Sequence, residues 1–198
     1  MNYHIFPDDK YVMSFIEVAE KVGIKGGNLY LVRDPKPYRY LPEDNKLLVD
    51  APVGSNTFND IMSKPGQGDR IFLHFISGHI RNWLADFETD AEINWVYWGN
   101  DFYTVLLPKN EDHFDTLTQQ LLNRNKPRLS RFYVLHIWRE YRAKLKRNKR
   151  LEQAAEISKR AAAKINAVYH FMQKDAELIK QHLNPDIKFR YFNYPQPA

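Results

Sequence analysis

The chain has 198 residues, a length that suits one α/β domain or two small ones. Hydrophobic residues make up 43% and aromatic residues 14%, which excludes a disordered chain. The absence of cysteine excludes a disulfide scaffold, a zinc–thiolate site and a cysteine nucleophile. No apolar run approaches the roughly 18–20 residues that span a bilayer, and residues 1–10 lack the pattern of a signal peptide.

The net charge of +5 conceals a strong asymmetry. Between Arg124 and Lys164 there are 14 Lys and Arg against 3 Asp and Glu, a net charge of +11, whereas the remainder is mildly acidic. A segment of this kind usually meets phosphate, on lipid or on nucleic acid. The plainer interpretation is a solvated helix face.

Alternating strands and helices are predicted over the first 110 residues. Strands are expected at residues 3–6, 29–32, 46–49, 70–75 and 93–98. Helices are expected between them around residues 12–19, 58–62 and 80–87. Strands joined through helices pair in parallel, and nearly continuous apolar strands indicate a sheet that is covered on both faces.

The same pattern resumes after the basic segment, with a strand at 165–170, a helix at 175–183 and a strand at 188–192. The predicted fold class is α/β, with a doubly wound, mostly parallel Rossmann-like sheet. We expect one domain over residues 1–198, interrupted by an inserted basic helical segment at about residues 113–162.

Ligands of open parallel sheets bind at the carboxyl ends of the strands, where the strand order reverses. Three predicted strand ends carry polar and small residues of the kind such sites use. These residues are Asp8 and Asp9, then His74, Ser77 and Gly78, and then Trp98, Gly99, Asp101 and Tyr103. Each group also has a structural interpretation: the two aspartates as helix caps, the histidine as a core residue, the aromatic residues as packing and the glycine as a turn.

Several motifs are missing, and their absence narrows the chemistry. No G-x-G-x-x-G follows the first strand, and neither a P-loop nor a G-x-S-x-G elbow occurs. The seven histidines do not show the spacing of a zinc site. We therefore expect neither a dinucleotide cofactor nor a bound metal.

Two stretches resemble one bacterial enzyme family. The first is Ile71–Gly78, and the second is the aromatic run Asn94–Tyr103, which has a Trp-Gly-x-Asp-x-Tyr pattern at 98–103. A further stretch, Lys164–Tyr194, resembles the end of the N-terminal half in the same family. These stretches resemble the TDP-N-acetylfucosamine:lipid II N-acetylfucosaminyltransferases, which are two-domain glycosyltransferases of the GT-B architecture. The resemblance implies transfer of an amino-deoxy sugar, such as 4-acetamido-4,6-dideoxygalactose, from a dTDP-sugar to a lipid-linked acceptor.

The resemblance also implies roles for the strand-end residues. Asp101 and His74 would contact the sugar or accept a proton; Ser77, Gly78 and Gly99 would shape the backbone; Trp98 or Tyr103 would stack on a sugar ring; and Asp8 and Asp9 would bind substrate. The nucleotide-sugar is the substrate in this family, and no separate cofactor is implied. The chain resembles the acceptor-side N-terminal half of such an enzyme, without the donor-binding C-terminal domain, so we expect it to be inactive alone.

A helix is predicted over residues 129–150, which contain neither glycine nor proline. Apolar residues including Trp138 gather on one face, and basic residues gather on the other. The basic residues are Arg131, Arg139, Arg142, Lys146 and Lys149. Such a helix can lie at a membrane interface, where each basic residue contributes roughly 1 kcal/mol near anionic lipid. The expected location is cytoplasmic, peripheral on the inner face of the cell membrane.

Two other interpretations of the basic segment remain open. Its apolar face can pack on the domain core and leave the charges solvated. Nucleic-acid binding is disfavoured because no recognised binding motif is evident. For the whole chain, the alternative function is a non-catalytic flavodoxin-like module that binds a nucleotide or another ligand.

Overall fold

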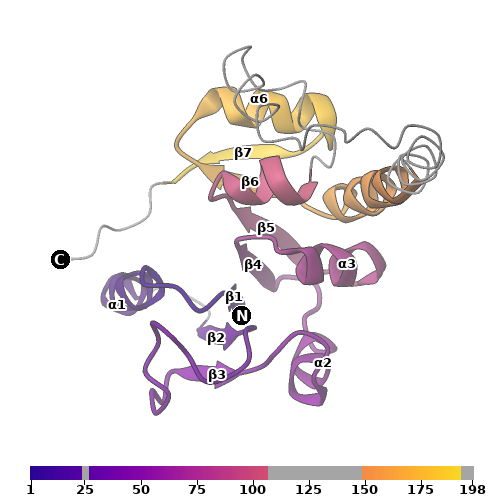
Figure 1. The fold of residues 1–198 in the computed structure, drawn as a ribbon. Coiled ribbons are helices and arrows are strands. Elements are labelled where there is room, and N and C mark those ends of the chain that lie inside the picture. The colour runs from indigo at the N-terminus through magenta and orange to yellow at the C-terminus, as the bar shows by residue number, and fades with distance from the viewer. Residues whose placement is uncertain (24–26, 107–148, 193–198) are drawn as a thin grey trace, which may run out of the picture.

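A computed structural model describes residues 1–23, 27–106 and 149–192 (Figure 1). Its centre is a seven-stranded sheet with the order β3-β2-β1-β4-β5-β6-β7, and every neighbouring pair is parallel. The strands are β1 (Asn2–Phe6), β2 (Asn28–Val32), β3 (Leu48–Asp50), β4 (Arg70–His74), β5 (Glu92–Val96), β6 (Ala167–His170) and β7 (Lys188–Tyr191). The predicted α/β fold with a parallel Rossmann-like sheet is therefore confirmed.

Helices connect most of these strands, as the apolar spacing predicts. They are α1 (Val12–Val22), α2 (Asn56–Met62), α3 (Gly78–Asp86), α6 (Gln173–His182) and a helix whose described part covers 149–163. Ser55 and Ser77 cap α2 and α3 by accepting hydrogen bonds from backbone N–H groups in the first turn. Gly23 ends α1 in the left-handed conformation, which glycine adopts without a steric penalty. A π-helix at Asp101–Leu106 was not predicted.

Side chains alternate between two cores on opposite faces of the sheet. On one face, Ile71, Leu73 and Trp95 pack with buried residues of α2, α3, α6 and the 149–163 helix. On the other, Phe6, Tyr30 and Val32 pack with α1. In the described part of the chain, α1 is the one helix whose buried residues join this second core. Figure 1 shows the same division, with α1 on the side of the sheet away from α2 and α3.

Most of the predicted membrane-facing helix lies outside the described residues. Arg131, Trp138, Arg139, Arg142 and Lys146 lie outside the described residues. Lys149 is exposed at the first described position of the 149–163 helix. Within the described ranges, no helix combines the length and the apolar character needed to cross a membrane.

Candidate functional site

The strand order reverses between β1 and β4, so the carboxyl ends of these two strands flank the point where open parallel sheets bind ligands. The chain leaves β1 for α1 on one face, and it leaves β4 for α3 on the other. Residues that directly follow β1, β2, β4 and β5 meet at this edge. We refer to it as the switch-point edge, defined by Asp8, Asp9, Arg33, Phe75 and Trp98.

Three half-buried aromatic side chains gather at the switch-point edge. The ring of Trp98 lies 5.9 Å from that of Phe75 and 6.3 Å from that of Tyr11. Trp98 was a predicted site residue, but Tyr11 and Phe75 were not. Phe75 has a φ of 68°, which is rare for a residue with a bulky side chain and costs of the order of 1–3 kcal/mol. Residues strained in this way cluster at functional sites.

The peptide unit that follows Phe75 is held from both sides by charged side chains. The Arg33 Nη1 atom donates to the Phe75 carbonyl at 2.7 Å, and the next backbone N–H, that of Ile76, donates to Asp101 Oδ2 at 3.2 Å. The Arg33 guanidinium also lies 5.4 Å from the Phe75 ring. This arrangement fixes the turn between β4 and α3, and it makes Arg33 a positioning residue that the sequence did not reveal.

Asp101 is fully buried and accepts several hydrogen bonds. The indole N–H of Trp95 donates to Oδ2 at 2.7 Å, and the backbone N–H of Trp98 donates to Oδ1 at 3.2 Å. Burial raises the pKa of Asp101 to about 6, against the opposing effect of these donors. Burial lowers the pKa of Arg33 to about 10, so Arg33 remains cationic at neutral pH. The Asp101 carboxylate therefore holds the backbone of the switch-point edge in place through these hydrogen bonds, and it has no contact with solvent.

The two aspartates after β1 have different environments. Asp8 is occupied, since its Oδ1 accepts from the backbone N–H groups of Tyr40 at 3.0 Å and Leu41 at 3.1 Å, while its Oδ2 accepts from Arg39. Asp9 Oδ1 accepts from the Tyr11 N–H at 2.9 Å, a contact within the turn before α1. The N-cap of α1 is Tyr11, and no side chain caps this helix, so the helix-cap interpretation of the two aspartates is wrong. The Oδ2 atom of Asp9 has no hydrogen-bond partner among residues 1–23, 27–106 and 149–192. Asp9 is therefore partly exposed, and one of its oxygens is available as an acceptor as far as the described residues are concerned.

The remaining predicted backbone-shaping residues lie at the same edge. Ser77 Oγ accepts from the Ile80 N–H at 3.4 Å, and Gly78 is the first residue of α3. Gly99 has a φ of 89° and lies in the turn before the π-helix, where its carbonyl accepts hydrogen bonds from the N–H groups of Phe102 and Tyr103. A side chain at position 99 would be strained, so the turn interpretation of Gly99 holds.

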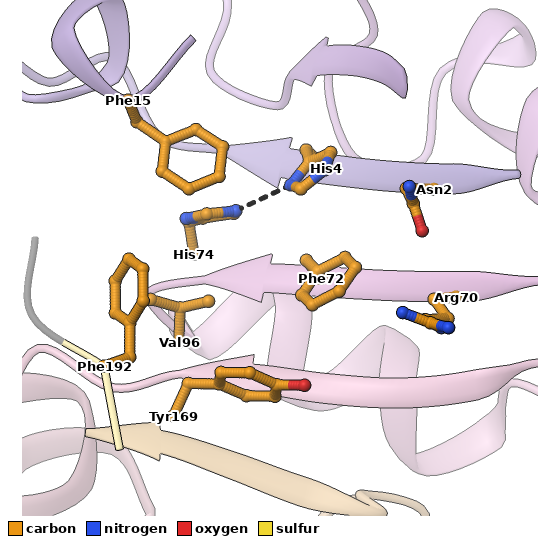
Figure 2. Close-up of a pocket in the computed structure, with 9 residues that line it drawn as sticks. All are labelled: Asn2, His4, Phe15, Arg70, Phe72, His74, Val96, Tyr169 and Phe192. Atoms are coloured by element: carbon orange, nitrogen blue, oxygen red, sulfur yellow. Dashed lines mark hydrogen bonds between the residues drawn. The ribbon is translucent and has the colours of Figure 1, made fainter. Parts of the chain in front are cut away.

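His74 points away from the place where Asp101 lies. Its fully buried imidazole faces the α1 side, with Nε2 3.1 Å from the Nδ1 of His4 (Figure 2). Burial lowers the pKa of His4 to about 4 and that of His74 well below its ordinary value, so both rings are neutral. Asp101 instead meets Trp95, which belongs to the opposite core. The two predicted proton acceptors therefore do not form one site in this structure.

A second polar cluster lies past the ends of β5 and β6, and the sequence did not indicate it. Asp175, a buried residue of α6, accepts from the hydroxyls of Tyr97 at 2.7 Å and Tyr103 at 3.3 Å. Burial and the Asp175 carboxylate raise the pKa of Tyr97. Tyr103, which was predicted to stack on a sugar, is thus tied to α6 through its hydroxyl.

Replacing Tyr97 by Phe is expected to destabilise the protein by about 2 kcal/mol, because the buried Asp175 carboxylate loses its shorter hydrogen bond. Urea unfolding at neutral pH measures the loss. Tyr40→Phe changes an exposed tyrosine and serves as the matched control, which should stay within about 0.5 kcal/mol of the wild type. Equal stabilities for Tyr97→Phe and the control would show that the bond contributes nothing.

Among the described residues, no group of three or more His, Asp or Glu side chains is arranged to hold a metal ion. In comparisons with known proteins, the chain matches no protein-family model, no curated protein and no solved structure. What the topology establishes is a parallel, Rossmann-like α/β domain.

Proposed function

We propose that this domain is the acceptor-side half of a GT-B glycosyltransferase, which moves an amino-deoxy sugar from a dTDP-sugar to a lipid-linked acceptor in bacterial surface glycan synthesis. The observation that carries the proposal is the combination at the switch-point edge of aromatic rings with a carboxylate oxygen that has no hydrogen-bond partner in the described part of the chain. Sugars present apolar C–H faces to rings and hydroxyls to carboxylates, so this combination suits a sugar acceptor.

The residues of the edge have distinct tasks in this reaction. An acceptor hydroxyl attacks the anomeric carbon of the donor; the new C–O bond forms as the bond to the diphosphate oxygen breaks. The hydroxyl proton passes to the carboxylate of Asp9, the best-placed acceptor because one of its oxygens has no hydrogen-bond partner among the described residues. Arg33 and Asp101 hold the β4–α3 turn, and the Trp98 ring stacks on the sugar.

A transfer assay tests the proposal with the full-length enzyme, a dTDP-sugar and a lipid-linked acceptor. We expect Asp9→Asn to lower turnover at least about 100-fold, the usual scale for a lost proton acceptor. The control is Asp44→Asn, an exposed aspartate in the loop before β3, which should retain activity. Normal turnover by Asp9→Asn would remove Asp9 from the reaction, and no transfer by the wild type would refute the function.

The isolated 198-residue chain is expected to give no turnover in the same assay, because the proposal assigns the nucleotide-sugar to a second domain. Binding of a free nucleotide without any transfer by the full-length protein would favour the alternative, a ligand-binding module. Turnover by the isolated chain would contradict the division into two domains.

The lipid-linked acceptor places the enzyme at the cytoplasmic face of the membrane, and the basic segment from Arg124 to Lys164 suits that location. We expect the chain to sediment with vesicles containing anionic lipid at low salt, and to be released at high salt because screening weakens surface attraction. Vesicles of neutral phosphatidylcholine are the control. Failure to bind anionic vesicles at low salt would rule out membrane docking.

A further inference from the structure

A cavity of about 150 Å³ lies on the α1 face of the sheet, beside α1 and over β1, β4, β5 and β6 (Figure 2). Its walls come from strand residues that point to this face, from Phe15 of α1 and from Phe192 just after β7. A cavity of this volume in another protein accommodates benzene. This cavity is therefore large enough for a six-membered ring or a branched chain of similar size.

The part of the cavity nearest the carboxyl ends of the strands is apolar and aromatic. Phe15 lies 4.8 Å from the His74 ring in an edge-to-face arrangement, and 6.4 Å from the ring of Phe192. Phe72 and Tyr169 form a second edge-to-face pair at 5.8 Å. Rings placed in this way offer both faces and edges to a further ring. The neutral His4–His74 pair adds no charge to this end.

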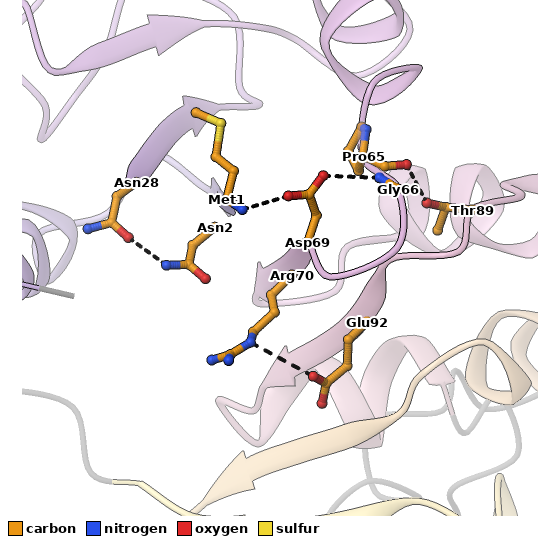
Figure 3. A network of polar contacts seen from close by, with 9 residues as sticks. All are labelled: Met1, Asn2, Asn28, Pro65, Gly66, Asp69, Arg70, Thr89 and Glu92. Atoms are coloured by element: carbon orange, nitrogen blue, oxygen red, sulfur yellow. Dashed lines mark hydrogen bonds and ion pairs between the residues drawn. The ribbon is translucent and has the colours of Figure 1, made fainter. Parts of the chain in front are cut away.

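The part nearest the amino ends of the strands is polar. The Asn2 carboxamide nitrogen donates to Asn28 Oδ1 at 3.1 Å (Figure 3), and its oxygen points toward Arg70 (Figure 2). The hydroxyl of Tyr169 is directed toward the same end (Figure 2). Among the residues that line the cavity, Arg70 is the one with a charged side chain.

Arg70 has capacity for a further anion. Among the residues that the structure describes, the carboxylate that pairs with it is that of Glu92, with Nε 4.0 Å from Oε2 (Figure 3). The two side chains are 57% and 43% exposed, and solvent-exposed pairs of this kind are weak. A carboxylate or phosphate at the rim would gain charge-assisted hydrogen bonds from the guanidinium.

We propose that this cavity binds a small amphipathic anion, an aromatic ring or branched aliphatic group joined to one carboxylate or phosphate. The apolar group enters between Phe15, Phe72 and Tyr169, and the anionic group meets Arg70 and the Asn2 side chain at the rim. None of the five residues that define the switch-point edge lines this cavity, and the inference does not depend on the glycosyltransferase proposal.

Calorimetry with the whole chain tests the site using four probes. Phenylacetate and phenyl phosphate compare the two anions, 3-methylbutanoate replaces the ring by a branched chain, and benzyl alcohol lacks the charge. We expect the anionic probes to bind about tenfold more tightly than benzyl alcohol, and Arg70→Gln to remove that preference. Arg160→Gln, an exposed arginine that pairs with Asp86 on α3, is the matched control and should bind like the wild type.

Two further measurements locate the probe. Val96→Trp fills the cavity and should abolish binding, and in the wild type the amide resonances of Phe72 and Tyr169 should shift when phenylacetate is added. The inference would be overturned if none of the anionic probes binds. It would also be overturned if Arg70→Gln binds them as tightly as the wild type, or if phenylacetate shifts only resonances of residues outside the cavity. Loss of sugar transfer in Asp9→Asn with normal phenylacetate binding would separate this site from the proposed active site.

Discussion

Asp101→Ala is expected to destabilise the protein by at least about 3 kcal/mol. The substitution leaves the indole N–H of Trp95 and the backbone N–H groups of Ile76 and Trp98 without their acceptor. Each buried donor left without a partner costs about 1–3 kcal/mol. Arg33 also loses an opposite charge, because the Asp101 carboxylate helps to keep its guanidinium protonated. Urea unfolding at pH 7.5 measures the loss.

Two companion variants separate the buried network from a general effect of removing an acidic residue. Asp86→Ala removes an aspartate whose side chain is 74% exposed, and it should change stability by no more than about 0.5 kcal/mol. Asp101→Asn keeps one acceptor oxygen, so its loss should fall between those of the other two variants. If Asp101→Ala unfolds at the same urea concentration as Asp86→Ala, the carboxylate does not hold this edge together.

The His4–His74 pair should make the folded protein sensitive to acid. The pKa of His4 is about 4 in the folded state against 6.5 for an ordinary histidine, so the unfolded chain binds more protons between these values. The contribution of His4 is therefore complete above pH 6.5 and is lost as the pH falls toward 4, by about 3 kcal/mol in all. Asp101, whose pKa is raised to about 6, works in the opposite direction in the same window.

A comparison of His4→Phe with the wild type isolates the contribution of His4 to the pH dependence of stability, because Asp101 titrates in both proteins. We expect the stability of His4→Phe relative to the wild type to improve by about 3 kcal/mol between pH 7.5 and pH 4, as followed by urea unfolding at each pH. The control is His79→Gln, at an exposed position of α3. A plot of its unfolding free energy against pH should run parallel to that of the wild type. A parallel curve for His4→Phe would mean that burial does not suppress its protonation.

Much of the fold could be predicted because each strand carries its own apolar run and each connection between strands is long enough for a helix. The residues at which the strands and helices end were harder to predict from the sequence. The strand expected at 70–75 ends at His74, because Phe75 adopts a positive φ. The π-helix was not predicted, because π-helices are rare and its six residues are too few to show a helical period in the sequence.

The candidate site was predictable in part. Asp8, Asp9, Ser77 and Trp98 could be placed at the carboxyl edge because any residue that directly follows a parallel strand lies there. The partners that decide their roles are distant in sequence: Arg33 contacts a carbonyl 42 residues away, and His74 pairs with a histidine 70 residues earlier. Single-residue patterns carry no information on such pairings, so the sequence left a core position for His74 open as one of two interpretations, and the burial of Asp101 became evident only from the structure.

The two outermost strands have a consequence for how the molecule avoids self-association. A parallel sheet that ends in open strands exposes unpaired backbone groups to strands of other molecules. Here β3 has only three residues and ends in Asp50, while β7 has four and carries the exposed Lys188 and Arg190. Short, charged borders offer a poor template for an added strand, so the sheet is protected against edge-to-edge aggregation at both margins.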